Sequence, residues 1–174
     1  MENTSSNLKS HILQYGIVLG GISVVFNLML FFLDMHYTQE PAVQWINYFI
    51  SISVTVLAIY NLRASNEGFM SLSEALKLGM GVAVISGLIA IVYTYILINF
   101  LDPDTIEKTL EVTQNKILEE NPEFSQEQLD GMKEMQRKFS GIGFLSAIIL
   151  VFSLFFGFII SLITGLILRR NRPE

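Results

Sequence analysis

Few side chains that could do chemistry occur at spacings that let them act together. The two histidines, His11 and His36, stand at opposite ends of the first apolar run, so they cannot share a metal ion if that run crosses a membrane. No His-x-x-x-His or Glu-x-x-His pair and no glycine-rich phosphate loop occurs, and the chain has no cysteine. We therefore expect no enzyme, with no catalytic residue, no metal ion and no cofactor.

The acidic residues do not match a known cation-binding motif. The stretch DPDTIEKTLEVT, which begins at Asp102, has the first two acids of a calcium-binding loop but lacks glycine at its sixth position and glutamate at its twelfth. Glu119, Glu120 and Glu123 could hold a divalent cation loosely. Their spacing is more typical of a solvated helix end, which is the interpretation we favour.

Four apolar runs must position whatever functional residues the chain has. Hydrophobic residues make up 51% of the 174 residues and charged residues 16%, and the mean hydropathy is +0.49. Each run is long enough for a helix that crosses a bilayer, which takes about 20 residues. The sequence predicts an all-α membrane protein with a single domain, 1–174, and four transmembrane helices at about 11–33, 42–62, 76–101 and 141–168.

Basic residues near the ends of these runs predict the orientation in the membrane. The first connection, DMHYTQE, has no lysine or arginine, whereas Arg63 and Lys77 flank the second connection. Arg169, Arg170 and Arg172 follow the fourth run. By the positive-inside rule, both termini are expected in the cytoplasm, although three basic residues just before the fourth run count against this orientation.

The acidic segment, residues 102–139, lies between the third and fourth runs and carries the net charge of the chain. It contains ten acidic and five basic residues, and the resulting −5 equals the formal net charge of the whole chain. Such a segment repels polyanions. Nucleic acid is therefore not an expected partner.

The acidic segment is patterned as an extracytoplasmic amphipathic helical hairpin. Asp102 is the expected N-cap of the first helix, with Pro103 in its first position. Pro122 ends this helix, and Ser125 with Gln128 predicts a capping box for the second. The apolar stripes of the two helices would cover each other, the membrane or a partner. The candidate partner surface is Ile106, Leu110, Ile117, Leu129 and Met132.

Inside the membrane the candidate polar side chains are uncharged. A proton- or ion-driven transporter usually needs an ionisable residue at membrane depth, and the four runs contain no Asp, Glu or Arg. The candidate intramembrane polar residues are Asn27, Ser86 and Thr94. We expect Asn27 to form a hydrogen bond to a neighbouring helix.

Small residues recur at four-residue intervals in three of the runs. Because lipid is as apolar as a helix surface, such stripes are typical of places where two helix backbones approach closely. They predict packing within a four-helix bundle, or against a second subunit beside the Phe-rich fourth run. The candidate packing residues are Gly16, Gly20, Gly79, Ala83, Gly87, Ser153, Gly157, Ser161 and Gly165.

Two helix boundaries can be read from local signals. Ser71 and Glu74 predict a capping box, so that the third transmembrane helix would start at about Leu72. Gly141 and Gly143 precede the fourth run and weaken a helix. They leave two alternatives open, namely a hinge or break at this point and a continuous helix from the hairpin into the fourth span.

Three stretches of the chain resemble a known family. They are YGIVLGGISVVF in the first run, NEGFMSLSEALKLGMGVAVISGLI around the start of the third, and INFLDPD at its end. They are similar to the small four-span bacterial membrane proteins grouped as domain of unknown function 4199. The resemblance implies a multi-pass protein of the bacterial inner membrane, and it brings no activity, ligand or site residue.

The acidic segment has an amphipathic helical pattern, and the four apolar runs contain no Asp, Glu or Arg. This combination favours a non-enzymatic accessory or interaction protein. The hairpin would dock a membrane-protein partner or form a homo-oligomer, with the lipid bilayer around the spans. The alternative is a small transporter or channel with a path lined by Asn27 and Ser/Thr residues.

Overall fold

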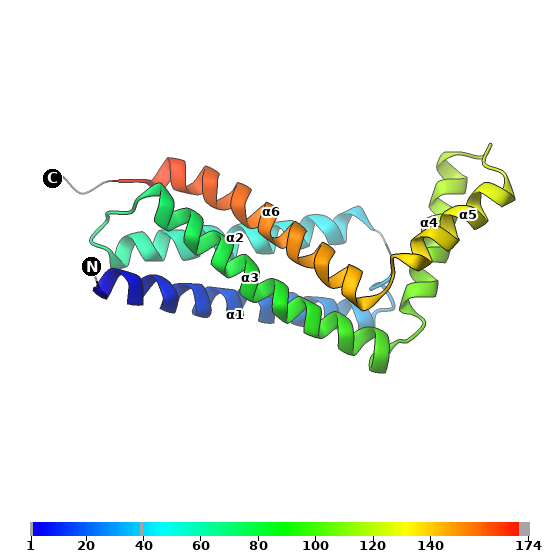
Figure 1. The fold of residues 1–174 in the computed structure, drawn as a ribbon, viewed down its shortest axis with the longest axis horizontal. Helices are drawn as coiled ribbons and strands as arrows, with labels where there is room; N and C mark the ends of the chain where they lie inside the picture. The colour runs from blue at the N-terminus through cyan, green and yellow to red at the C-terminus, as the bar shows by residue number, and fades with distance from the viewer. Residues whose placement is uncertain (1, 39, 171–174) are drawn as a thin grey trace.

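The computed structural model describes residues 2–38 and 40–170, and the side chains from residue 7 onward. The described chain is helical apart from its connections and one isolated bridge between Met70 and Arg170, which confirms the all-α class. The elements in Figure 1 are α1 (Glu2–Phe32), α2 (Pro41–Ser65), α3 (Leu72–Ile96), the π-helix η1 (Leu97–Leu101), α4 (Thr105–Glu120), α5 (Gln126–Lys138) and α6 (Ile142–Leu168).

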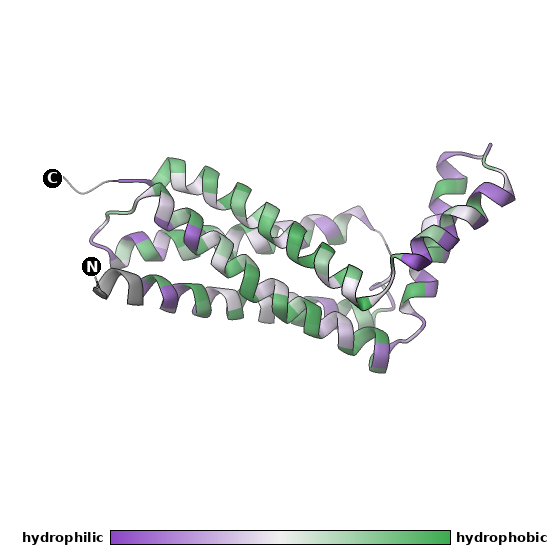
Figure 2. Ribbon diagram, in the orientation of Figure 1, coloured by the Kyte–Doolittle hydropathy of each residue, from purple (hydrophilic) through white to green (hydrophobic). Residues whose placement is uncertain are grey.

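Four helices are long and apolar enough to cross a membrane, so the chain is a multi-pass membrane protein. These candidate spans are Asn7–Phe32, Pro41–Ser65, Leu72–Leu101 and Ile142–Leu168. Hydrophobic residues, green in Figure 2, recur along all four spans. Many of their large side chains are exposed, and Phe32 and Ile167 are more than 70% exposed. A water-soluble bundle would bury such side chains, whereas lipid accommodates them.

The four spans lie side by side, with α3 packed between α1 and α6 (Figure 1). The start of α1, the end of α6 and the α2–α3 connection share one end of the bundle, while α4 and α5 project from the other end. The best-buried side chains belong mainly to α2, α3 and the connection between them. They are Ala58, Ile59, Leu62, Met70, Ala75, Leu78 and Val82.

The predicted packing residues lie where α3 meets its two neighbours. On the α1 side, a Cβ added at Gly16 would come within 2.5 Å of Ile85. On the α6 side, a Cβ added at Gly157 would lie 2.6 Å from that of Ala83. Side chains this close would overlap, so only glycine allows these backbone distances.

The remaining candidates of this set lie along the same two seams. Gly20 faces Ile89 across the α1–α3 seam. Across the α3–α6 seam, Gly79 faces Ser161, Gly87 faces Ser153, and Gly165 faces Ala75. The small residues therefore join three spans of one chain.

At the end of the bundle near the termini, a capping box starts α3 and a backbone pairing joins residues that are distant in sequence. Ser71 Oγ accepts a hydrogen bond from the Glu74 amide at 3.2 Å, and the Glu74 carboxylate accepts from the Ser71 amide at 2.8 Å, which confirms the predicted capping box. The amide and carbonyl groups of Met70 and Arg170 pair at 2.9 Å in both directions. This bridge ties the end of α6 to the α2–α3 connection.

The helix that leads into the fourth span is broken. The second helix, α5, ends at Lys138, and α6 begins at Ile142 with Gly141 as its N-cap. Gly143 lies inside α6. Of the two alternatives left open by the sequence, the structure shows the break, and it lies at Gly141.

Candidate functional site

The helices α4 and α5 pack against each other in opposite directions. Lys133 Nζ lies 2.9 Å from a Glu107 carboxylate oxygen, and Gln114 Nε2 donates to the Leu129 carbonyl at 3.2 Å. Between these two contacts, Leu110 is 6% and Leu129 1% exposed. We refer to α4, α5 and their connection, residues 105–138, as the hairpin. Its capping box at Ser125 and Gln128 is present as predicted.

Part of the predicted partner surface is wrong. Leu110 and Leu129 form the hairpin's own small core, because they lie on the sides of α4 and α5 that face each other. Ile106, Ile117 and Met132 are only partly covered. The large apolar side chains that stand free on the two hairpin helices are instead Leu118 and Met135, which lie outside the stripes read from the sequence.

The charge of the hairpin is concentrated in the half that lies away from the bundle. Because α4 runs outward and α5 returns, residues 111–130 form this distal half (Figure 1). It contains six acidic residues and one basic residue, Lys116, a net −5 that equals the charge of the whole chain. The acidic residues are Glu111, Glu119, Glu120, Glu123, Glu127 and Asp130, and all six are exposed. The rest of the chain is neutral overall.

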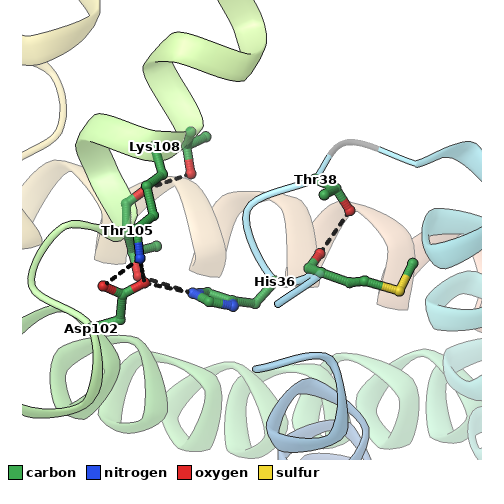
Figure 3. Close-up of polar contacts among 7 residues, drawn as sticks. His36, Thr38, Asp102, Thr105 and Lys108 are labelled. Carbon is green, nitrogen blue, oxygen red and sulfur yellow. Dashed lines mark hydrogen bonds and ion pairs between the residues drawn. The ribbon is translucent and has the colours of Figure 1, made fainter. Parts of the chain in front are cut away.

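A polar cluster connects the base of the hairpin to the α1–α2 connection (Figure 3), and all of it is buried or nearly so except the Lys108 side chain, which is 40% exposed. His36 Nε2 lies 2.9 Å from Asp102 Oδ2, and Lys108 Nζ donates to the same carboxylate at 2.8 and 3.0 Å. Thr105 Oγ1 lies 3.3 Å from His36 Nε2. The His36 side chain is 3% and the Asp102 side chain 12% exposed. We call these four residues the anchor.

The electrostatics of the anchor follow from these contacts. The Lys108 ammonium group lowers the pKa of Asp102 to about 2, against the opposing effect of burial, with further help from His36 and Thr105. The same carboxylate raises the pKa of Lys108. An ionised carboxylate only accepts hydrogen bonds, so His36 Nε2 is the donor in its contact with Asp102. Its Nδ1 is buried and has no hydrogen-bond partner among the described residues.

The predicted role of Asp102 as the N-cap of the first hairpin helix is wrong. Asp104 occupies that position, and α4 begins at Thr105 rather than at Pro103. The Asp102 carboxylate is turned toward Lys108 and His36 instead of toward the first amides of α4. His36 lies 66 residues earlier in the chain, and the local pattern around Asp102 contains no signal for it.

The intramembrane candidates do not converge on one place. Asn27 Nδ2 donates to the carbonyl of Ser23 in its own helix at 2.8 Å, so the expected hydrogen bond to a neighbouring helix is wrong. Ser86 Oγ donates to the Ala83 carbonyl at 3.2 Å, also within its own helix. Thr94 is half-buried further along α3. Ser86 lines a cavity between the spans, and Asn27 is not part of its wall.

The comparison with protein families gives one match. A family model described as "Protein of unknown function (DUF4199)" matches residues 14–170 and confirms the resemblance seen in the sequence. No curated protein and no solved structure matches the chain.

Proposed function

We propose that this chain, which belongs to the DUF4199 family, is a non-enzymatic accessory protein of the bacterial inner membrane whose acidic hairpin docks a partner protein. One observation carries the proposal. The whole net charge of the chain lies in the distal half of a hairpin that is held on the bundle by the anchor. A connecting loop without a binding role would need neither the contacts of the anchor nor a net charge concentrated in its distal half.

The extracytoplasmic side is favoured for the hairpin by the distribution of basic residues. Arg63, Lys77, Arg169 and Arg170 lie at the end of the bundle that holds the start of α1 and the end of α6. Under the positive-inside rule this end faces the cytoplasm. The hairpin then stands on the opposite side of the membrane.

The two halves of the hairpin suit different neighbours. In the half next to the bundle, Lys108, Lys133 and Lys138 are paired with carboxylates, so this half carries little net charge and anionic lipid does not repel it. The distal half is repelled by anionic lipid and by the same half of a second copy. A partner with a basic surface fits it best, since complementary charge steers association and selects the partner.

The proposal is tested by purification in mild detergent with two matched double variants. Glu119→Gln with Glu123→Gln removes charge from the distal half, and Asp104→Asn with Glu134→Gln removes the same charge near the bundle. We expect the distal pair to lower the recovery of a co-purifying protein at least about threefold, because the complementary charge is lost. The control pair should recover it as the wild type does. Equal recovery from both variants would contradict docking through the distal half.

A further inference from the structure

The spans enclose a cavity that the proposed function does not use. It measures about 320 Å³ and lies between α2, α3 and α6 at the level of Ser51 and Thr55, with Leu19 of α1 also in its wall. Phe152 and Tyr48 also line it, and they are 57% and 40% exposed on the lipid-facing surface. The cavity is therefore reached sideways from the bilayer, between α2 and α6.

Three hydroxyl groups in the cavity wall lack the partners that such groups usually find in a membrane helix. A serine or threonine in a membrane helix commonly donates to a carbonyl of the preceding turn. Ser146 and Ser161 do so at 2.7 and 3.1 Å. Within the described residues the structure records no hydrogen bond for the hydroxyls of Ser51, Thr55 or Ser153, all of which line the cavity.

The case is sharpest for Thr55. This residue is only 2% exposed, and it lines the cavity. An unpaired hydroxyl in an apolar environment costs free energy. A hydroxyl or carbonyl oxygen of a ligand in the cavity would remove this cost.

The wall of the cavity selects the chemical class of that ligand. Asn47, Ser51 and Thr55 follow one another at four-residue intervals and so form one polar stripe on α2. Phe152 and Phe156 contribute aromatic surface from α6. Among the described residues, none that lines the cavity is Asp, Glu, Lys, Arg or His, so a charged headgroup would be left without a counter-ion there. The volume lies at the lower end of the range for small-molecule sites, about 300–1,000 Å³.

We propose that this cavity binds an uncharged amphiphile from the bilayer, with its hydroxyl or carbonyl oxygens on the α2 stripe and its apolar part against the α6 phenylalanines. The volume suits the polar end and the first part of a lipid-like molecule rather than a whole phospholipid. This site is independent of the hairpin and of any partner that the hairpin docks.

The test uses the full-length protein in lipid nanodiscs and two photoreactive probes of equal chain length. One is a long-chain alcohol with a diazirine near its hydroxyl, and the other carries a quaternary ammonium group in place of the hydroxyl. We expect the alcohol to label peptides that contain residues 47–55 and 152–157 and to be displaced by unlabelled alcohol. Non-displaceable labelling spread over all lipid-facing surfaces, or equal labelling by both probes, would overturn the proposal.

Three variants make the test specific. Thr55→Val keeps the side-chain shape and removes the hydroxyl, so the concentration of alcohol needed for half-maximal labelling should rise about fivefold. Ser51→Phe fills the cavity and should abolish displaceable labelling. Ser146→Ala removes a hydroxyl outside the cavity and should leave labelling unchanged. Retained cavity labelling in Ser51→Phe, or unchanged labelling in Thr55→Val, would show that the probe does not use this site.

Discussion

Asp102 is the residue through which the hairpin meets the bundle. Its carboxylate binds Lys108 from α4 and His36 from the α1–α2 connection, so one side chain joins segments that are distant in sequence. The contact between His36 and Asp102 is protected from water, since the two side chains are 3% and 12% exposed, whereas solvent weakens the ion pair with Lys108, which is 40% exposed. The orientation of the hairpin therefore depends strongly on this one carboxylate.

Replacement of Asp102 by asparagine tests that dependence. Asp102→Asn keeps the size of the side chain but weakens the contact with the buried His36 ring, so we expect the local stability of the hairpin base to fall by about 1 kcal/mol. Faster amide hydrogen exchange in residues 102–110 would measure the change. Asp104→Asn, at an exposed neighbouring position, is the control and should leave exchange unchanged. Equal exchange rates in Asp102→Asn and the wild type would contradict the anchor.

The pKa of Asp102 predicts how the anchor responds to acid. This pKa is about 2 in the folded protein and 3.8 in the unfolded chain, so the carboxylate stabilises the fold above pH 3.8. That contribution is lost as the pH falls from about 4 through 2. The difference in thermal unfolding between the wild type and Asp102→Asn should therefore be full at pH 5 and much smaller at pH 2, where the carboxylate is about half protonated. A difference as large at pH 2 as at pH 5 would contradict this assignment.

At the scale of the elements, α3 depends on glycine to approach both of its neighbours. Gly157 has no room for a Cβ because Ala83 lies opposite, whereas a Cβ added at Gly21 in α1 meets nothing within 4 Å. Both glycines lie inside long helices, so alanine should raise the intrinsic helix propensity equally at either position. The two positions differ in packing alone.

The pair Gly157→Ala and Gly21→Ala isolates the packing contribution. Gly157→Ala should destabilise the bundle by about 1–3 kcal/mol, since overpacking forces the α3–α6 seam apart. Gly21→Ala should be neutral or stabilising by up to about 1 kcal/mol. Unfolding in mixed micelles measures both. A Gly157→Ala variant as stable as Gly21→Ala would show that the seam is not close-packed.

Helix starts were predicted well because their signals lie within a few residues of each other. The candidate site was predicted less well because it depends on contacts between residues that are far apart in the sequence. The capping boxes at Ser71 and Ser125 involve residues three positions apart, so the sequence contains both partners. One of the two partners of Asp102, His36, is 66 residues away, so the role of Asp102 could not be found from the pattern around it. Leu110 and Leu129 were identified as apolar, but the sequence could not show that each covers the other.

Two further features show where sequence reasoning ends. The side chain of Asn27 could bond to its own helix or to a neighbour, and spacing alone does not distinguish these partners. The cavity beside Thr55 arises from the combined shapes of four helices, and no single stretch of sequence encodes it. The Asn27 hydrogen bond and the cavity both depend on how the four spans are arranged. The stripes of small residues indicate which spans approach closely, but they do not determine the whole arrangement.

At the scale of the whole molecule, the account predicts one orientation in the membrane. The chain has no cysteine, so a single introduced cysteine is a unique label. Glu123→Cys on the hairpin should react in intact spheroplasts with a membrane-impermeant maleimide, and Ala64→Cys at the other end of the bundle should react only after permeabilisation. Both positions are exposed, so accessibility within the fold does not limit either reaction. The reverse pattern would contradict extracytoplasmic docking.

The central claim is that the distal half of the hairpin contacts a partner protein, and crosslinking in cells tests it most directly. A photoreactive residue at position 123 should give one discrete protein adduct, and Glu119→Lys with Glu127→Lys in the same chain should remove it. The same residue at position 163, where Ile163 is 56% exposed on α6, serves as the lipid-facing control and should not give that adduct. Only lipid or intramolecular adducts at position 123, or an adduct that persists after charge reversal, would contradict the proposed function.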